Sequence, residues 1–429
     1  MKKLLKPVLF GMAVTMGVSG FGPGGAHAAQ STSTLDWTYT LPADLDMNYG
    51  VLDNGAFSGD NIYFWAIQEG ADGNKLVVQS FDQENGDKDN WTYAFKDSKE
   101  ILNSSGQVFS DKQGNSYFLR IAADGKYKLV SLNAEGKIRW QTPLGAGTVK
   151  QLYPVNNGDL VVSDSVQTKN FEVVNVFSTY GSDGKLKNTK QVKASDLGDK
   201  NAMLSVLPDG RVQAKGPNKL QLFKSLNDLK KPVLTHNISQ WTNIALNSRT
   251  DQFGSAIFTL SGGQTLIRFD TTDMSAVSNT PNGQEVDSSK VKRTNSLVLF
   301  DANGKKKWER ALTPQQGLVP TADGFALQTG GKIELYGADN KLKNSKTVQG
   351  EDLWLAKAKT TDELTLTSSK SGLFMTLDPK DLSVKYELDL SKATETKAPY
   401  TFLYEGKGEL YVHATDAGGS KTVSHYKLK

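Results

Sequence analysis

The chain has 429 residues, of which 38% are hydrophobic and 22% are charged, and its formal net charge is +4. This composition is typical of a globular protein and excludes a disordered tail. Positive and negative side chains are interspersed without a basic stripe that would neutralise phosphates, so we expect no nucleic acid partner.

The first residues have the pattern of an export signal. Three lysines precede an apolar stretch that ends near Phe21, and Ala26-His27-Ala28 supplies the small residues of a cleavage site. We predict a signal peptide over 1–28 and a secreted, extracellular chain over 29–429, exported in the manner of a Gram-positive protein. No later stretch is long and apolar enough to cross a bilayer, so we expect no membrane insertion after signal cleavage. No cysteine occurs, so the hydrophobic core alone must stabilise the fold.

One pattern recurs along the rest of the chain: a β-rich run, an Asp or Asn, a Gly-Lys turn, and a second run that opens with Trp. The sharpest copies are 129–140 and 297–308, and a third copy begins at Leu76 and reaches Trp91. Glycine tolerates the positive φ of a tight hairpin turn, and the flanking Val, Leu, Phe and Tyr favour strands. Because a second hairpin turn precedes many copies, each unit is predicted to be a four-stranded meander.

The spacing of the units indicates a closed ring. Their hairpins are centred near residues 85, 135, 183, 228, 302, 339 and 379. Most intervals are about 40 to 50 residues, which is the period of a propeller blade. We predict an all-β chain that forms a single β-propeller of eight four-stranded blades. The alternative is a seven-bladed ring with an irregular segment over 200–240, where the repeat is weakest.

Two departures from the repeat have structural explanations. The long interval after residue 228 contains a polar segment, 271–294, which we interpret as a loop inserted into blade five. The last unit has only three strand-like runs before the chain ends. The segment 35–41 resembles the fourth strands of other units, such as 91–95, so we predict that it completes the last blade and closes the ring. Closure would protect an edge strand that is otherwise exposed.

The Leu-x-x-x-Asp-x-x-Gly-Lys-x-x-Trp copies resemble the PQQ-like (quinoprotein-type) β-propeller repeat family, over nearly the whole mature chain. The resemblance implies that Trp91, Trp140 and Trp308 pack between blades, and that Trp37 joins them through the closing strand. The family includes quinoprotein dehydrogenases and also members that bind no quinone, such as scaffold proteins of bacterial envelopes. Its alcohol-oxidising enzymes commonly carry a vicinal disulfide beside the quinone, which a chain without cysteine cannot form. We therefore expect the branch that binds no quinone, and no cofactor.

Motifs of hydrolytic or metal catalysis are absent from the sequence. There is no Gly-x-Ser-x-Gly elbow, no His-Glu-x-x-His and no phosphate-binding glycine-rich loop. Only His236, His413 and His425 remain after export processing. The last two fall in the predicted last blade and could lie near each other, but we interpret them as strand histidines with ordinary hydrogen bonds.

We interpret the charged clusters of the sequence as solvent-exposed turns rather than as catalytic or binding sites. The adjacent carboxylates are Asp44 with Asp46, Asp362 with Glu363, and Glu351 with Asp352. The acidic loop 82–90 lacks the spacing and the bidentate Glu of a Ca²⁺ loop, so it is predicted to be a hairpin turn. The one basic cluster comprises Lys290, Lys292 and Arg293.

Three tryptophans, Trp65, Trp241 and Trp354, lie outside the position that ends a blade, and core packing is the favoured role for each. We assign no catalytic, cofactor-binding or metal-binding residue. The expectation is a monomeric, non-catalytic propeller that acts as a binding or scaffold module for a protein, a peptide or a cell-wall polymer. The alternative is an extracellular hydrolase or lyase that acts on polysaccharide with carboxylates at the channel mouth.

Overall fold

The computed structural model describes residues 33–429 with gaps. The longest of these gaps are 47–55, 69–74, 87–91, 95–100, 103–107, 245–256 and 287–291. The predicted signal peptide, 1–28, lies outside the described residues.

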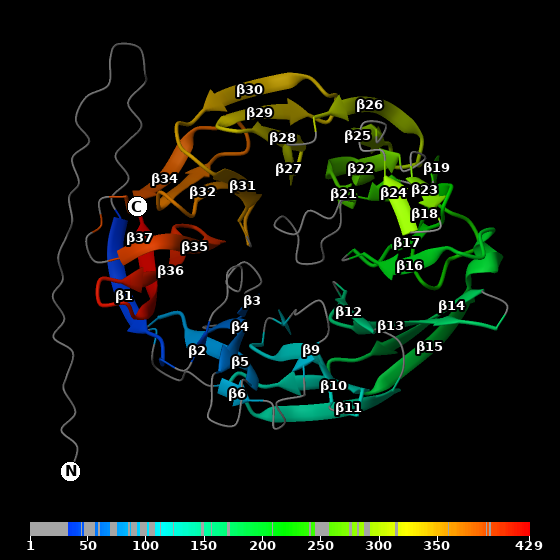
Figure 1. The fold of residues 1–429 in the computed structure, drawn as a ribbon, viewed down its shortest axis with the longest axis horizontal. Coiled ribbons are helices and arrows are strands. Elements are labelled where there is room, and N and C mark those ends of the chain that lie inside the picture. The colour runs from blue at the N-terminus through cyan, green and yellow to red at the C-terminus, as the bar shows by residue number, and fades with distance from the viewer. Residues whose placement is uncertain are drawn as a thin grey trace.

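Eight antiparallel sheets follow one another in chain order around a common axis, as Figure 1 shows. We call these sheets blades one to eight. Each blade has four strand positions. In blades one, two and five the first position is divided between two short strands that pair with the same neighbour, and blade eight takes its fourth strand from the N-terminal end of the chain. This arrangement confirms the predicted eight-bladed propeller. The segment 200–240 forms a regular four-stranded blade, so the seven-bladed alternative is wrong.

Blade one contains β2 (Leu45–Asp46), β3 (Ala56–Ser58), β4 (Asn61–Gln68), β5 (Lys75–Asp82) and β6 (Thr92–Ala94), and blade two contains β7 (Ile101–Leu102), β8 (Phe109–Ser110), β9 (Ser116–Ile121), β10 (Lys126–Leu132) and β11 (Ile138–Ala146). Blade three contains β12 (Gln151–Pro154), β13 (Leu160–Gln167), β14 (Val173–Tyr180) and β15 (Leu186–Lys193). Blade four contains β16 (Met203–Val206), β17 (Val212–Lys215), β18 (Lys219–Phe223) and β19 (Leu234–Asn237).

Blade five contains β20 (Thr242–Ile244), β21 (Ile257–Thr259), β22 (Thr265–Asp273), β25 (Lys292–Phe300) and β26 (Lys306–Leu312), and blade six contains β27 (Gly317–Thr321), β28 (Gly324–Thr329), β29 (Lys332–Gly337) and β30 (Leu342–Thr347). Blade seven contains β31 (Leu353–Lys357), β32 (Leu364–Ser368), β33 (Leu373–Leu377) and β34 (Val384–Asp389). Blade eight contains β35 (Thr396–Gly406), β36 (Glu409–Asp416), β37 (Lys421–Leu428) and β1 (Ser33–Thr40).

The N-terminal strand closes the ring as predicted. β1 pairs antiparallel with β37, from Ser33 opposite Leu428 to Thr40 opposite Thr422. A bulge at Asp36 interrupts the register. Figure 1 shows β1 beside the C-terminal strand of the same sheet. The last blade therefore gains its fourth strand from the other end of the chain.

The hydrophobic core is divided among the junctions between neighbouring blades. In the described part of the chain, each junction has its own cluster of buried side chains. One cluster joins Phe81 of blade one to Tyr411 of blade eight, for example, and both side chains are almost fully buried. Alternation along each strand sends apolar side chains to the two faces of a blade, where the adjacent blades cover them. The ring is held together by these junctions.

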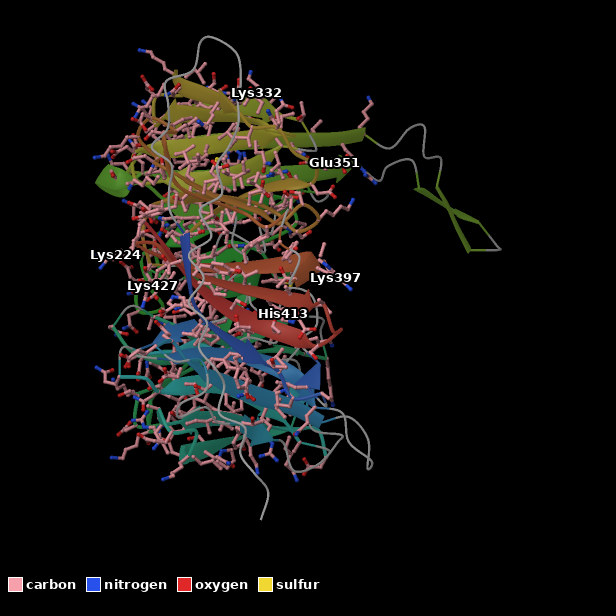
Figure 2. The ribbon with its side chains drawn as sticks, turned by 90° about the vertical axis from the view of Figure 1, so that its left-hand side faces the viewer. Lys224, Lys332, Glu351, Lys397, His413 and Lys427 are labelled. Atoms are coloured by element: carbon pink, nitrogen blue, oxygen red, sulfur yellow. The ribbon has the colours of Figure 1, made fainter. Side chains whose placement is uncertain are left out.

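The polar segment 271–294 extends the second and third strands of blade five. β22 runs on to Asp273 and β25 begins at Lys292, and a short hairpin of β23 (Val277–Thr280) and β24 (Gly283–Val286) lies between them. Figure 2 shows this hairpin projecting away from one face of the ring. Within the described residues there is no helix with the length and hydrophobicity needed to span a bilayer.

Candidate functional site

Three tryptophans connect neighbouring blades in the same way. Trp37, Trp140 and Trp308 each lie on the outermost strand of a blade and donate the indole N–H to a backbone carbonyl in the next blade's hairpin turn. The acceptors are Gln83 at 3.0 Å, Ser182 at 3.0 Å and Ala338 at 2.8 Å. These contacts agree with the packing between blades that the sequence resemblance implies. Trp91 lies outside the described residues.

The close approach of the indole ring depends on glycine in the facing turn. A Cβ atom added to Gly184 would lie 2.5 Å from the Trp140 ring, and one added to Gly86 would overlap the Trp37 ring. Both glycines also have positive φ, at 76° and 75°. Any other residue would therefore meet both the ring and an unfavourable backbone conformation.

Backbone register identifies the same position in blades that lack this tryptophan. Trp140 and Trp308 each follow directly after a bulge in the pairing of the third and fourth strands. Asn188 of blade three, Asn344 of blade six and Tyr386 of blade seven occupy the equivalent register. At these three positions a different side chain faces the next blade of the propeller in place of the indole.

At the junction of blades six and seven, asparagine replaces the tryptophan contact. The Asn344 side chain donates to the backbone carbonyl of Asp381 in the facing turn. At the junction of blades three and four, a lysine makes the connection instead. Lys190, two residues beyond Asn188, donates to the carbonyl of Leu226.

A cleft of about 500 Å³ lies at this junction of blades three and four. Its volume is within the range of ligand pockets. Its apolar wall includes Phe177, Val206 and Leu226, and Asn188 lies on its rim. Asn188 is exposed, whereas Phe177 and Val206 are buried in the cluster that joins the two blades. The cleft thus lies at the repeat position that an indole fills elsewhere.

The cleft is shaped by an unusual turn in blade four. Ser225 and Asp228 form an isolated β-bridge, and Asp228 N–H donates to the Ser225 carbonyl at 3.1 Å. Leu226 is half-buried and packs against the cluster below. Figure 2 shows Lys224, next to Ser225, on the face of the ring opposite the projecting hairpin. The cleft is therefore on the side where the turns between third and fourth strands lie.

Ion pairs neutralise both carboxylates of the cleft. Lys187 lies 2.5 Å from Asp159, and Arg211 lies 2.8 Å from Asp209. Because both carboxylates have cationic partners, they are poorly suited to act as a general acid and base pair. The charge that remains in the cleft is that of Lys190, whose ammonium bonds a carbonyl.

The two histidines of the last blade, His413 and His425, lie on adjacent strands but have different surroundings. His425 is buried between two carboxylates, with Nε2 2.6 Å from Glu409 Oε2 and Nδ1 3.2 Å from Asp36 Oδ2. Its ring also stacks on Tyr411 at 4.6 Å. Burial lowers the pKa of His425, against the opposing effect of the two carboxylates. These contacts hold β1 onto the last blade.

Among the described residues, no cluster of three or more metal-ligating side chains occurs around His236 or His413. His236 packs against Phe269 and Phe300 of blade five, at 5.0 and 5.3 Å between ring centres. Burial lowers its pKa. His413 lies in the middle of β36, two residues from the position opposite His425.

The two carboxylate pairs that the structure describes, Asp362 with Glu363 and Glu351 with Asp352, do not converge. Glu363 is buried and accepts a hydrogen bond from Tyr404 of blade eight at 2.9 Å, whereas Asp362 is exposed and pairs with Lys357 at 2.5 Å. Asp352 pairs with Lys370 at 2.5 Å, and Glu351 beside it is exposed. Asp44, and the side chain of Asp46, lie outside the described residues, as does most of the loop 82–90.

The remaining sequence candidates are surface or undescribed positions. Trp354 on the inner strand β31 is 38% exposed, so the core-packing role predicted for it is wrong, whereas its neighbour Leu355 is buried. Lys292 and Arg293 are exposed at the start of β25. Lys290, Trp241 and the side chain of Trp65 lie outside the described residues.

Carboxyl groups with a raised pKa do not form a pair in the described residues. Burial, with Asp389 nearby, raises the pKa of Glu387 in β34. Burial, with Glu409 nearby, raises the pKa of Glu405 in β35. Glu387 lies on the outermost strand of blade seven and Glu405 on the innermost strand of blade eight, and the acidic neighbour of each belongs to its own sheet.

Sequence reasoning missed the cleft, although one signal of it is visible. Four residues after the turn glycine, tryptophan stands in the sharp copies, as in Gly136 with Trp140. The copy with Gly184 has Asn188 there instead. The volume left by that exchange could not be foreseen, because it depends on how the turn of blade four folds against it.

No model of a known protein family and no curated protein matches the chain. Among solved structures, the Dos1 propeller is similar with a TM-score of 0.50 and 11% identity, over 92% of this chain and 95% of that chain. Dihydro-heme d1 dehydrogenase NirN in complex with DHE has a TM-score of 0.46 and 14% identity, over 80% and 66% of the two chains. Polysaccharide lyase Uly1 has a TM-score of 0.43 and 11% identity, over 88% and 90%. At 11% identity, the similarity to the Dos1 propeller supports the propeller fold alone.

Proposed function

We propose that this chain is an exported, non-catalytic β-propeller that binds an extracellular protein, peptide or cell-wall polymer. The observation that carries the proposal is the cleft between blades three and four, whose carboxylates are both ion-paired. A cleft with an apolar wall and a polar rim suits recognition of a ligand. It lacks the free acid and base that cleavage of a glycosidic bond needs.

We further propose that the chain is a divergent member of the PQQ-like repeat class that binds no quinone. The indole contacts of Trp37, Trp140 and Trp308 with the following blade support this assignment. We also infer that the protein works as a monomer, because β1 pairs with β37 of the same chain, so no second chain is needed to complete the last blade.

The experiment compares binding with turnover on the same ligands. The purified chain is titrated calorimetrically with soluble cell-wall polymer fragments and with peptides from exported proteins, and each ligand is weighed by mass spectrometry before and after incubation. We expect saturable binding of at least one ligand with its mass unchanged. Catalytic shortening of a polysaccharide would overturn the proposal in favour of a hydrolase or lyase.

Two variants at the same repeat position localise the binding. Asn188→Tyr places a bulky, uncharged side chain on the rim of the cleft, and we expect it to weaken binding about tenfold or more. Asn344→Tyr makes the same change at the junction of blades six and seven and is expected to leave the affinity within about twofold of the wild type. Equal effects of the two substitutions would place the binding surface elsewhere on the ring.

A further inference from the structure

The cleft between blades three and four is equivalent to a position that the chain fills with an aromatic ring at other junctions. Trp140 lies between blades two and three, and Trp308 lies between blades five and six, each in the register that Asn188 has here. In those junctions the ring packs on other aromatic side chains: Trp140 on Tyr117 at 6.0 Å, and Trp308 on Phe325 at 5.7 Å. In the cleft, Phe177 and Leu226 provide the corresponding apolar surface. An aromatic group from outside the chain would therefore find the surroundings that an indole has elsewhere in the ring.

The charges around the cleft are mainly positive. The carboxylates of Asp159 and Asp209 are already paired with cations, which leaves Lys190 as the cation that holds only a carbonyl oxygen. The adjoining connection between β18 and β19 carries further exposed lysines opposed by a single aspartate: Lys224, Lys230 and Lys231 against Asp228. A ligand with carboxylates beside its aromatic group would complement this surface.

We propose that the cleft binds an aromatic side chain flanked by carboxylates in a partner polypeptide. This inference rests on the proposed binding function and names the class of its ligand. The aromatic ring packs against Phe177, Val206 and Leu226, and a neighbouring carboxylate pairs with Lys190 at the rim. Buried aromatic anchors of this kind commonly supply most of the affinity of a small interface.

The direct test uses synthetic peptides whose binding is followed by fluorescence anisotropy. The probe is a labelled Gly-Asp-Asp-Trp-Asp-Asp-Gly peptide, titrated with the full chain. One comparison peptide has alanine in place of tryptophan, and a second has lysine in place of each aspartate. We expect each comparison peptide to bind about thirtyfold or more weakly than the probe, because one lacks the anchor and the other carries the wrong charge.

Two substitutions of the protein test the location. Asn188→Trp supplies the missing indole from within the chain, and we expect it to weaken probe binding about thirtyfold while the thermal midpoint rises. Asn344→Trp is the matched control on blade six and should leave probe binding within about twofold of the wild type.

A third substitution tests the role of charge. Lys190→Met keeps an unbranched apolar chain that is one atom shorter and removes the ammonium group. We expect this variant to bind the probe about fivefold more weakly, and its affinity to depend less on salt than that of the wild type.

Two results would overturn the inference. One is equal binding of the tryptophan and alanine peptides. The other is probe binding that Asn188→Trp leaves unchanged. If the chain then still binds a cell-wall polymer, and Asn188→Tyr weakens that binding, only the aromatic, acidic ligand is wrong and the proposed function stands. If the chain binds neither peptides nor polymers, the proposed function itself fails.

Discussion

Trp37 donates its indole N–H to the backbone carbonyl of Gln83 at 3.0 Å, and this contact joins the closing strand of blade eight to the turn of blade one. The two residues are 46 positions apart in the chain. The same contact recurs at two other junctions, so ring closure uses the interaction that also holds neighbouring blades together. The energetics of closure can therefore be tested at any of the three tryptophans.

The first prediction concerns the indole at the junction of blades two and three. Because Trp140 is only half-buried, we expect Trp140→Ala to lower the free energy of unfolding by about 2 kcal/mol, less than for a fully buried tryptophan. Trp140→Phe keeps part of the packing and loses the hydrogen bond to Ser182, which costs about 1 kcal/mol. Urea unfolding measures both values. Ile138→Ala, at an exposed position on the same strand, is the control and should change stability by less than about 0.5 kcal/mol.

The second prediction separates the effect of the tryptophan ring from that of backbone strain. Gly184 and Gly125 have nearly the same positive φ, at 76° and 74°, but a Cβ atom at Gly125 meets no atom within 4 Å. We expect Gly125→Ala to cost about 1 kcal/mol through its backbone conformation alone. Gly184→Ala should cost about 1 to 3 kcal/mol more, because its Cβ displaces the Trp140 ring. Equal losses in chemical denaturation would show that the ring does not depend on this glycine.

The third prediction concerns acid. Burial alone would raise the pKa of Glu363, but hydrogen bonds from Tyr404 and Thr361, together with Lys385, hold it below its ordinary value. A carboxyl whose pKa is lowered by folding stabilises the protein when charged, and this stability is lost as the pH falls through its titration range. We expect Glu363→Gln to be less stable than the wild type at neutral pH and to lose less stability on acidification. Asp362→Asn changes an exposed neighbour and should follow the wild-type profile in thermal melts across the acid range.

The fourth prediction concerns the closing strand itself. Deletion of residues 33–40 removes β1 and exposes the edge of β37, together with Tyr411 and His425, which β1 helps to cover. Unpaired strand edges promote association between chains. We expect the shortened chain to unfold at a lower temperature and to form oligomers in size-exclusion chromatography with light scattering. A monomer as stable as the full chain would contradict the role of β1.

Much of the fold could be predicted from the sequence because each blade repeats a local pattern. The turn glycines and the alternating apolar residues of copies such as 129–140 specify hairpins, and their spacing specifies eight blades. The closing strand could also be predicted, because the last unit lacked a strand and 35–41 had the form of one. These features depend on local periodicity and on the strand that the last unit needs to match the other blades.

The rest depends on contacts that no local pattern contains. His425 lies between Glu409 and Asp36, and Asp36 is 389 positions away in the chain, so its environment exists only once the ring has closed. The segment 271–294 reads as a polar loop, yet the structure extends β22 and β25 into it, because each strand continues to pair with the other. The cleft, too, arises from the exchange of tryptophan for Asn188 combined with the fold of a turn in the next blade.

The equivalence of Asn188 and the three indole positions is tested most directly by the urea unfolding of Asn188→Trp. If the cleft can accommodate an indole as the other junctions do, the new side chain fills it and raises the free energy of unfolding by about 1 kcal/mol. A decrease in stability, or none of the expected gain, would contradict the equivalence on which the proposed binding site depends.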